Sequence, residues 1–218
     1  MGYNSFEDLP RWAVEESGKR LGVYLGDIPV GEGPVVDIGC GRGEWLELLK
    51  GKGIPAYGVD NNPEVAARAA TRGLDVRTEN GLDHLRAVGE RTVNTVTAFH
   101  VAEHLPLDVL IELIDLSLAA LRPGGKLILE TPNPANLSVG STTFWLDPTH
   151  IRPLPSDLLA FLVESRGFTD DEVRPLSRSE LPIEVPAEGG DPVVAQLAGV
   201  VNRYLGAAAD YAVLATRL

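Results

Sequence analysis

The sequence contains a single cysteine, Cys40, among 218 residues. One thiol cannot form an intramolecular disulfide, and it cannot build a metal cluster of cysteine ligands. Scarcity of cysteine favours a reducing compartment, so we expect a cytoplasmic protein. The start of the chain also lacks the basic and apolar segments of a secretory signal, which agrees with that expectation.

Positive charge is scarce as well. The chain has 19 Lys and Arg against 31 Asp and Glu, which gives a formal net charge of −12. Such a chain repels the phosphates of nucleic acids, and no basic run offsets the repulsion, so we expect no nucleic-acid partner. Charged residues interrupt the apolar runs within about ten positions, so we predict no membrane span.

Residues 34–133 show a regular alternation. Short runs rich in β-branched residues alternate with segments whose apolar residues recur at helical spacing. This order predicts βαβ units and a mainly parallel sheet with helices on both faces. The strands that we expect are 35–38, 56–59, 75–79, 93–99, 126–129, 168–176 and 211–216.

We interpret residues 1–218 as a single domain with three additions. Residues 1–30 predict an N-terminal helical cap. Residues 131–155 are rich in proline but also carry aromatic residues, so we predict an ordered acceptor lid rather than a linker. Residues 177–206 form an insertion before the last strand, with a helix expected over 192–206. This insertion is a candidate for a homodimer contact or for a wall of the acceptor pocket.

A glycine-rich turn follows the first expected strand. The run Asp37-Ile38-Gly39-Cys40-Gly41-Arg42-Gly43 links that strand to a helix. Glycine there permits positive φ and close approach of a ligand to the backbone, and the helix start offers free N–H groups. An ordinary strand-to-helix turn has the same features, so both interpretations stay open. Glu44 stands where a dinucleotide fingerprint has its third glycine, and no P-loop lysine follows.

Asp60 ends the next expected strand, and an acidic side chain about twenty residues after Gly39 can bind both hydroxyls of a ribose. The run Asp60-Asn61-Asn62-Pro63 is also typical of a helix N-cap. The two roles are compatible.

Three motifs in order give the sequence a family resemblance. The turn at 37–43, the strand end Gly58-Val59-Asp60 and the segment Leu121-Arg122-Pro123-Gly124-Gly125-Lys126-Leu127 resemble those of class I S-adenosylmethionine-dependent methyltransferases. The resemblance covers residues 30–175 and fits the last expected strand. It implies an α/β, Rossmann-like sheet of seven strands in the order 3-2-1-4-5-7-6, with strand 7 antiparallel.

The same resemblance implies S-adenosylmethionine as cofactor and assigns residues to it. The glycine-rich turn would hold the amino-acid end of the cofactor, Asp60 its ribose, and Asn80-Gly81 its adenine, where many relatives have aspartate in place of Asn80. The residues that we assign to the cofactor are Asp37, Gly39, Cys40, Gly41, Asp60, Asn61, Asn80, Gly81 and His100.

Histidines gather after the fourth expected strand. His100, Glu103 and His104 follow it, and open α/β sheets bind ligands at the carboxyl ends of their strands. His150 lies in the expected lid, whereas we predict that His84 faces solvent on a helix. Three interpretations remain open: a histidine general base for a hydroxyl, capping of the following helix, or a divalent-metal site made of His100, Glu103, His104 and His150.

A closer resemblance bears on these alternatives. Glu103-His104-Leu105 is similar to an element of ubiquinone-pathway and sugar O-methyltransferases. The set His100-x-x-Glu103-His104 with His150 resembles the Glu-x-x-Glu-His…His metal set of small-RNA 3′-end 2′-O-methyltransferases, with His100 in place of the first glutamate. The expected metal is Mg²⁺ or Mn²⁺, and an imidazole at position 100 suits Mn²⁺ better. We predict that His104, Glu103 and His150 are catalytic.

The expected lid supplies the substrate prediction. Its segments 131–136 and 144–155 resemble methyltransferases of bacterial polysaccharide and glycan pathways, which implies O-methylation of a sugar hydroxyl in a glycoside or oligosaccharide. The residues that we assign to this acceptor are Phe144, Trp145, Asp147 and Arg152. The aromatic pair also suits packing of the lid, and the aspartate also suits a turn. RNA ribose or a small phenolic metabolite is the alternative acceptor, and a non-catalytic cofactor-binding protein is the third option.

Overall fold

The computed structural model describes residues 20–176 and 191–218. Most of the predicted N-terminal cap and the first part of the 177–206 insertion therefore lie outside the described residues. The strands are β1 (Val35–Ile38), β2 (Ala56–Asp60), β3 (Val76–Thr78), β4 (Val93–Phe99), β5 (Leu121–Pro132), β6 (Phe168–Leu176) and β7 (Asp210–Arg217). The α-helices are α3 (Glu44–Gly51), α4 (Pro63–Thr71), α5 (Gly81–Ala87), α6 (Leu107–Ala120), α7 (Leu137–Ser141), α8 (Ser156–Ser165) and α9 (Pro192–Tyr204). The 3-10 helices are η1 (Gly22–Asp27), η2 (Ala102–His104) and η3 (Thr143–Leu146).

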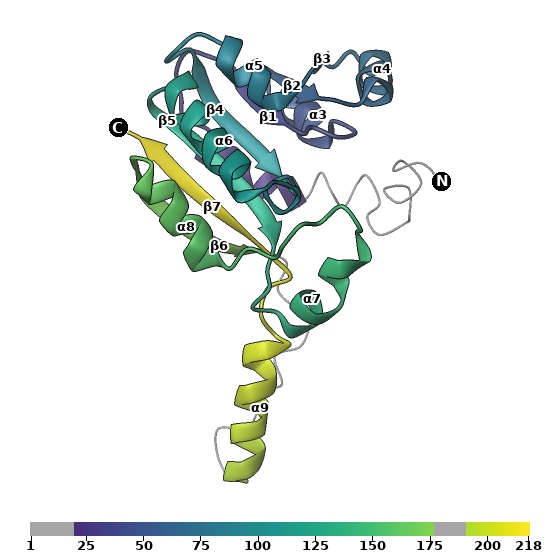
Figure 1. The fold of residues 1–218 in the computed structure, drawn as a ribbon, viewed down its shortest axis with the longest axis vertical. Helices are drawn as coiled ribbons and strands as arrows, with labels where there is room; N and C mark the ends of the chain where they lie inside the picture. Colours follow the sequence, from purple (N-terminus) through teal and green to yellow (C-terminus); the bar gives the residue numbers. More distant parts are fainter. Residues whose placement is uncertain (1–19, 177–190) are drawn as a thin grey trace.

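One seven-stranded sheet runs through the molecule in the order β3-β2-β1-β4-β5-β7-β6 (Figure 1). The five strands from β3 to β5 pair in parallel. β7 pairs antiparallel with both of its neighbours, β5 and β6. The strand order and the direction of β7 confirm the Rossmann-like fold that the sequence predicts.

Helices cover both faces because successive strand residues point to opposite sides. Val35 packs in a cluster with Trp45 and Leu49 of α3, while its neighbour Val36 packs in a second cluster with Leu110 of α6. The second cluster also holds residues of α5 and α8. In Figure 1, α5, α6 and α8 accordingly lie along one face of the sheet.

The carboxyl ends of the parallel strands form one edge of the sheet, and the chain segments that follow these strands gather there. We call the ends of β1, β2 and β3, with their following turns, the cofactor edge. We call the ends of β4 and β5, with residues 131–155, the acceptor edge. Within residues 131–155 the chain forms α7 and η3, so the proline-rich segment has helical structure of its own.

The structure corrects one local prediction. His84 is 3% exposed rather than facing solvent. Its imidazole hydrogen-bonds the Tyr57 hydroxyl and the Glu79 carboxylate, which is how the structure accommodates a buried histidine.

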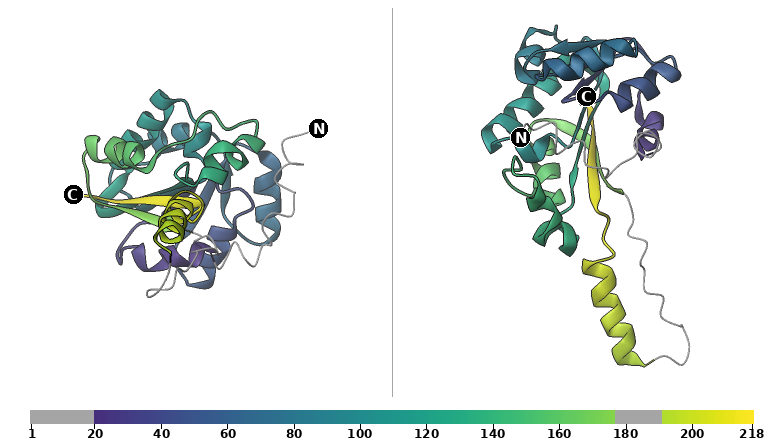
Figure 2. Two further views of the ribbon diagram at one scale, coloured as in Figure 1. Left: turned by 90° about the horizontal axis from the view of Figure 1, so that it is seen from below. Right: turned by 90° about the vertical axis from the view of Figure 1, so that its right-hand side faces the viewer.

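Helix α9 extends away from the layered body, beyond the start of β7 (Figure 2). It ends at Tyr204, two residues before the end of the predicted helix. None of the helices in residues 20–176 and 191–218 is long and apolar enough to cross a membrane.

Candidate active site

The turn after β1 has the backbone that a ligand cradle requires. Gly39 and Gly41 have φ values of +68° and +50°, which L side chains rarely adopt. A Cβ at Gly39 would also lie 2.6 Å from Cγ2 of Val101, so the first glycine is required by close packing as well. Around Gly41 no heavy atom lies within 4 Å of such a Cβ, so the turn keeps open space on that side.

Asp60 holds this turn from the end of β2. Its Oδ2 accepts a hydrogen bond from the Gly41 N–H (3.1 Å), and its Oδ1 accepts one from the Asn62 N–H (2.9 Å). The cap of α4 is made by Asn62, whose side chain accepts from the Glu64 N–H. A carboxylate has about four acceptor positions, so Asp60 keeps capacity for further donors such as ribose hydroxyls.

Asp37 and Cys40 are both buried in the cofactor edge. The Thr97 hydroxyl donates to Oδ1 of Asp37 (2.6 Å), and burial raises the pKa of the Asp37 carboxyl to about 7. The Cys40 side chain packs against β2, where a Cβ on Gly58 would lie 2.4 Å from its Sγ. Burial raises the pKa of that thiol, so Cys40 lines the turn as an unreactive thiol.

The remaining cofactor candidates lie after β2 and β3. Asn61 and Asn80 are exposed. Oδ1 of Asn80 accepts from the N–H groups of Leu82 and Asp83 at the start of α5, so this amide serves as a helix N-cap. A Cβ at Gly81 would lie 2.7 Å from Cγ2 of Ile38. The lack of a side chain at Gly81 therefore lets the start of α5 pack closely against β1.

These residues fit S-adenosylmethionine. The cofactor carries an ammonium and a sulfonium group, and the turn after β1 lies beside a buried carboxylate, Asp37, whose pKa is raised by burial. The open space at Gly41 and the spare acceptor capacity of Asp60 meet the needs of a backbone cradle and a ribose site.

His100 lies between two buried carboxylates rather than in the cofactor turn. Its φ is +54°, and its Nε2 and Nδ1 lie 3.0 Å from Oε1 of Glu130 and 3.3 Å from Oε1 of Glu103. Burial acts to lower the pKa of His100, but the hydrogen bond and charge of Glu103 raise it. Burial likewise acts to raise the pKa of Glu103, and the hydrogen bond and charge of His100 outweigh it, so that pKa is lowered. Both shifts favour the charged form of each group.

Glu130 was not among the residues that we assigned from the sequence. It is fully buried, and it accepts from the Tyr24 hydroxyl and the Arg20 guanidinium. His100, Glu130 and Asp210 lie close enough to hold a metal, but Arg20 already supplies the cation there. We therefore assign a structural role to His100, Glu130 and Asp210. The sequence signal of Glu130 is an acidic residue inside the apolar run of β5.

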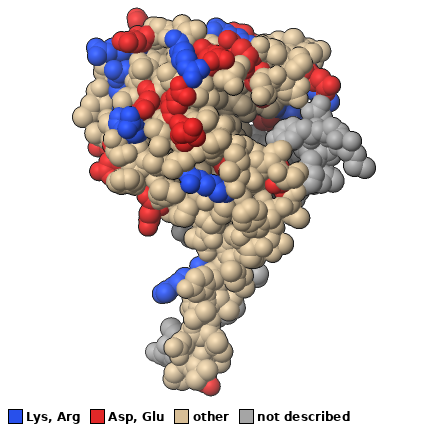
Figure 3. All heavy atoms as spheres, in the orientation of Figure 1, with Lys and Arg blue, Asp and Glu red and all other residues tan. Residues whose placement is uncertain are grey.

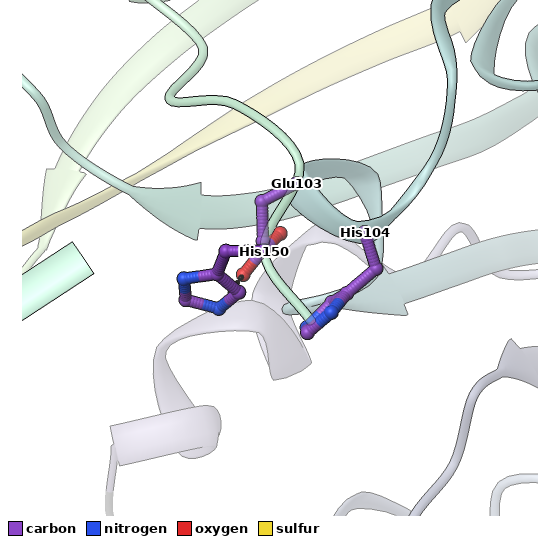
Figure 4. Close-up of side chains that lie close together, drawn as sticks. All are labelled: Glu103, His104 and His150. Carbon is purple, nitrogen blue, oxygen red and sulfur yellow. Dashed lines mark ion pairs between the residues drawn. The ribbon is translucent and has the colours of Figure 1, made fainter. Parts of the chain in front are cut away.

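Glu103, His104 and His150 converge at the acceptor edge. Each offers a ligand atom, and these atoms lie within 4.8 Å of one another. Figure 4 shows the three side chains brought together from η2 and from the loop after η3. Nε2 of His150 lies 3.9 Å from Oε1 of Glu103. That oxygen is buried and also lies 3.3 Å from Nδ1 of His100, whereas Oε2 accepts from the Thr131 hydroxyl (2.9 Å).

Hydrogen bonds fix the tautomers of both histidines. The Thr149 hydroxyl donates its proton to Oδ1 of Asp147 (2.6 Å), so it accepts from Nδ1 of His104 (2.9 Å). Nδ1 of His150 donates to the Phe144 carbonyl (2.6 Å). In the neutral form with its proton on Nδ1, each imidazole presents a lone pair on Nε2. Burial lowers the pKa of His104, which favours that neutral form.

The four acceptor candidates have different environments. Phe144 is 1% exposed and packs against the His150 ring, so it supports the loop and offers no face to an acceptor. Our assignment of Phe144 to the substrate is therefore corrected. Trp145 is 55% exposed and its Nε1 donates to the Gly140 carbonyl. Asp147 accepts from the Thr149 N–H and hydroxyl, which is a turn role. Nε and Nη2 of Arg152 are buried without a hydrogen-bond partner in the described residues.

Comparison with known proteins agrees with this geometry. The family profile described as "Methyltransferase domain" matches residues 14–173, so the chain belongs to that family, within the class I S-adenosylmethionine-dependent methyltransferases. A crystal structure of an S-adenosylmethionine-dependent methyltransferase from Archaeoglobus fulgidus matches with a TM-score of 0.88 and 29% identity, over 99% of this chain and 100% of that one.

Two curated relatives match part of the chain. A trans-aconitate 2-methyltransferase of Rhizobium meliloti is 33% identical over 152 residues, which cover 68% of this chain and 51% of that protein. A "probable S-adenosylmethionine-dependent methyltransferase" of Mycolicibacterium smegmatis is 30% identical over 134 residues, covering 62% and 51% respectively. The chain thus spans about half the length of the curated relatives it matches.

Proposed function

We propose that the chain transfers the methyl group of S-adenosylmethionine to a hydroxyl of a sugar acceptor, at a divalent-metal site formed by Glu103, His104 and His150. The observation that carries this proposal is the convergence of these three side chains, with Nδ1 of each histidine hydrogen-bonded to another group so that Nε2 is left for a ligand. Two imidazoles and a carboxylate are an adequate ligand set for a divalent transition metal, and among the expected ions they suit Mn²⁺ better than Mg²⁺.

The cofactor edge would hold S-adenosylmethionine through the glycine-rich turn, Asp60 and Asn80. The bound cofactor supplies an electrophilic methyl group on a sulfonium. Asp60 fixes the turn through the Gly41 N–H, and the protein's part is to orient the donor towards the acceptor edge. Since β1 and β4 are parallel neighbours in the sheet, the cofactor edge and the acceptor edge lie side by side at the carboxyl ends of the strands.

The acceptor edge would bind the hydroxyl and remove its proton. A divalent ion held by these ligands supplies Lewis acidity, which lowers the pKa of a bound hydroxyl. With Nε2 of His104 engaged as a ligand, the proton of the hydroxyl would pass to solvent water, and His104 would be the proton acceptor only in the alternative without a metal. Support for a metal comes from the hydrogen bonds that orient both imidazoles, because metal-binding histidines commonly donate their other N–H to a carbonyl or a polar side chain. His100 is bonded to Glu103 and Glu130, so we remove it from the proposed ligand set.

Two side chains of residues 131–155 suit a sugar carrying an anionic group. The exposed Trp145 ring provides an aromatic face. The buried nitrogens of Arg152 lack a partner in the described residues, and an unpaired buried guanidinium is costly until an acceptor satisfies it. Uronic acids and sugar phosphates offer a sugar ring to the Trp145 face and an anionic group to Arg152.

The test is methyl transfer from labelled S-adenosylmethionine to a panel of neutral sugars, uronic acids and sugar phosphates, followed by mass spectrometry. We expect an alkali-stable methyl ether that chelator abolishes and Mn²⁺ restores. Chelator-insensitive transfer would refute the metal and leave His104 as a simple base. No methylated sugar in any arm would refute the acceptor class.

Carboxylate methylation is the second candidate, favoured by Arg152 and by the similarity to a trans-aconitate methyltransferase. A carboxylate is already deprotonated at neutral pH and needs neither base nor metal. Its product is an ester, which mild alkali hydrolyses. The same mass-spectrometric assay with an alkali wash separates the two candidates.

A further inference from the structure

Helix α9 carries large apolar side chains that face solvent. Each of them is between 42% and 60% exposed. They are Val193, Val194, Leu197, Val200, Tyr204 and Leu205. Patches of more than a few hundred Å² of contiguous apolar surface are rare on monomers and usually mark an interaction site.

The apolar residues form a regular seam. Val193, Leu197, Val200 and Tyr204 follow one another at spacings of four, three and four residues, which is the spacing of the seam in paired helices. The spacing is also symmetric about the centre of α9. An antiparallel second copy would therefore set Leu197 against Val200 and Val193 against Tyr204, as a closed two-fold interface requires.

The scarcity of charged residues on α9 indicates which kind of partner it would bind. α9 contains no acidic residue and one basic residue, Arg203, in a chain of net charge −12. Figure 3 shows few charged side chains on the projecting part of the molecule, whereas acidic and basic groups are scattered over the body in that view. A second acidic copy can approach closely only where neither copy carries charge. An anionic membrane is disfavoured, because interfacial helices rely on a basic polar face that α9 lacks.

The base of α9 is attached to the acceptor edge. Asn133 donates through its side-chain amide to the Ala208 carbonyl (2.9 Å), and Asn136 does so to the Ala207 carbonyl (2.7 Å). The Asn133 N–H also donates to the Ala209 carbonyl (2.8 Å). These bonds hold the segment between α9 and β7 against the acceptor edge.

From these observations we infer that α9 is the interface of a homodimer, in which two copies pair their seams antiparallel about a two-fold axis. The inference is independent of the proposed acceptor and metal. Because the interface lies beyond the sheet, each copy keeps its own cofactor edge.

Light scattering after gel filtration tests the inference with the full chain. We expect the wild type to have twice the chain mass of 23.3 kDa. Leu197→Glu should weaken the dimer by about 100-fold or more, since it would bury a charge at the centre of the seam. The matched control is Phe161→Glu on α8, because Phe161 is similarly exposed (62% against 59%) and lies outside the seam. The control should remain dimeric.

A cross-linking experiment protects the test against misfolding of the charged variant. Leu197→Cys and Val200→Cys chains are mixed and oxidised, and the only native thiol, Cys40, is buried. We expect a disulfide-linked dimer at higher yield from the mixture than from either chain alone. A monomeric wild type, a dimer that survives Leu197→Glu, or equal loss in Phe161→Glu would overturn the inference.

Discussion

Asp37 and Glu103 are both buried carboxylates at the same end of one sheet, yet their surroundings shift their pKa values in opposite directions. Asp37, in the cofactor edge, has a pKa raised by burial to about 7. Glu103, in the acceptor edge, has a lowered pKa, because His100 outweighs the effect of burial. Burial dominates at Asp37, while Glu103 is paired with His100 and has the imidazoles of His104 and His150 beside it.

The comparison extends to how each edge is built. The cofactor edge relies on backbone N–H groups, positive-φ glycines and one aspartate that joins two turns. The acceptor edge relies on side chains from segments more than forty residues apart, such as His104 and Thr149. Substitutions should therefore damage donor binding at one edge and the chemical step at the other.

The largest effect is expected for Glu103→Gln. The change keeps the shape of the side chain but removes a metal ligand and the partner of His100, so kcat should fall by about 10²–10⁴-fold. Affinity for S-adenosylhomocysteine, measured by calorimetry, should be unchanged. The matched control is Glu130→Gln, because Glu130 is equally buried and also contacts His100. Glu130→Gln should keep most of the activity at low temperature. Equal loss in both variants would mean that Glu103 and Glu130 contribute to the same function.

Stability should depend on pH through Asp37. The pKa of this carboxyl in the folded protein, about 7, is above its ordinary value of 3.8. The folded state therefore binds more protons than the unfolded chain between about pH 4 and pH 7, and stability falls as pH rises through that window, by up to about 4 kcal/mol.

Urea unfolding without cofactor measures this effect. Asp37→Asn should remove most of the decline between pH 4 and pH 7, and the exposed Asp75→Asn should leave it in place. The same decline in both variants would show that Asp37 is ionised in the fold.

Gly41→Val should lower cofactor affinity by about 100-fold, since a β-branched residue resists positive φ and fills the open side of the turn. Gly53→Val is the matched control, because Gly53 has a φ of +69° and a Cβ added there would meet no heavy atom within 4 Å, but this glycine lies between α3 and β2. Both variants should lose similar stability, of about 1–2 kcal/mol. If calorimetry shows equal loss of affinity in both variants, then backbone strain, and not the shape of the turn after β1, determines cofactor binding.

Asp60→Ala should weaken S-adenosylmethionine binding by about 1.5–3 kcal/mol, the range for hydrogen bonds to a charged group. Part of this loss reflects the turn that Asp60 holds through Gly41. Asp60→Asn should lose less, because an amide oxygen still accepts one bond. Calorimetric affinity unchanged by the alanine substitution would remove Asp60 from the site.

Trp145→Ala should give the smallest effect, an increase of about tenfold in the acceptor KM with cofactor affinity unchanged. Its neighbour Phe144 sharpens the contrast. Phe144→Ala should lower the free energy of unfolding by about 3–5 kcal/mol, because that ring is buried. Steady-state kinetics and urea unfolding of both variants separate binding from packing, and a large stability loss for Trp145→Ala would contradict the assignment.

The sequence predicted the fold well because its signals are local. The strand at 35–38, the turn at 37–43 and Asp60 are recognisable from composition and spacing, and the strand order followed from the family resemblance. The acceptor edge was harder, since the neighbours of each histidine come from distant segments. Glu130, which pairs with His100, is signalled only by an acidic residue inside the apolar run of β5, and Thr149, which hydrogen-bonds Nδ1 of His104, has no pattern in the sequence. His84 was misassigned because its partner Tyr57 belongs to another strand.

The central claim is that Glu103, His104 and His150 bind a divalent metal, and calorimetric titration of Mn²⁺ into the chain with S-adenosylhomocysteine tests it without knowledge of the acceptor. We predict one ion per chain, binding lost in His150→Ala, and binding retained in His84→Gln, which changes a buried histidine bonded to Tyr57. The absence of saturable binding, or equal binding in His150→Ala, would contradict the account.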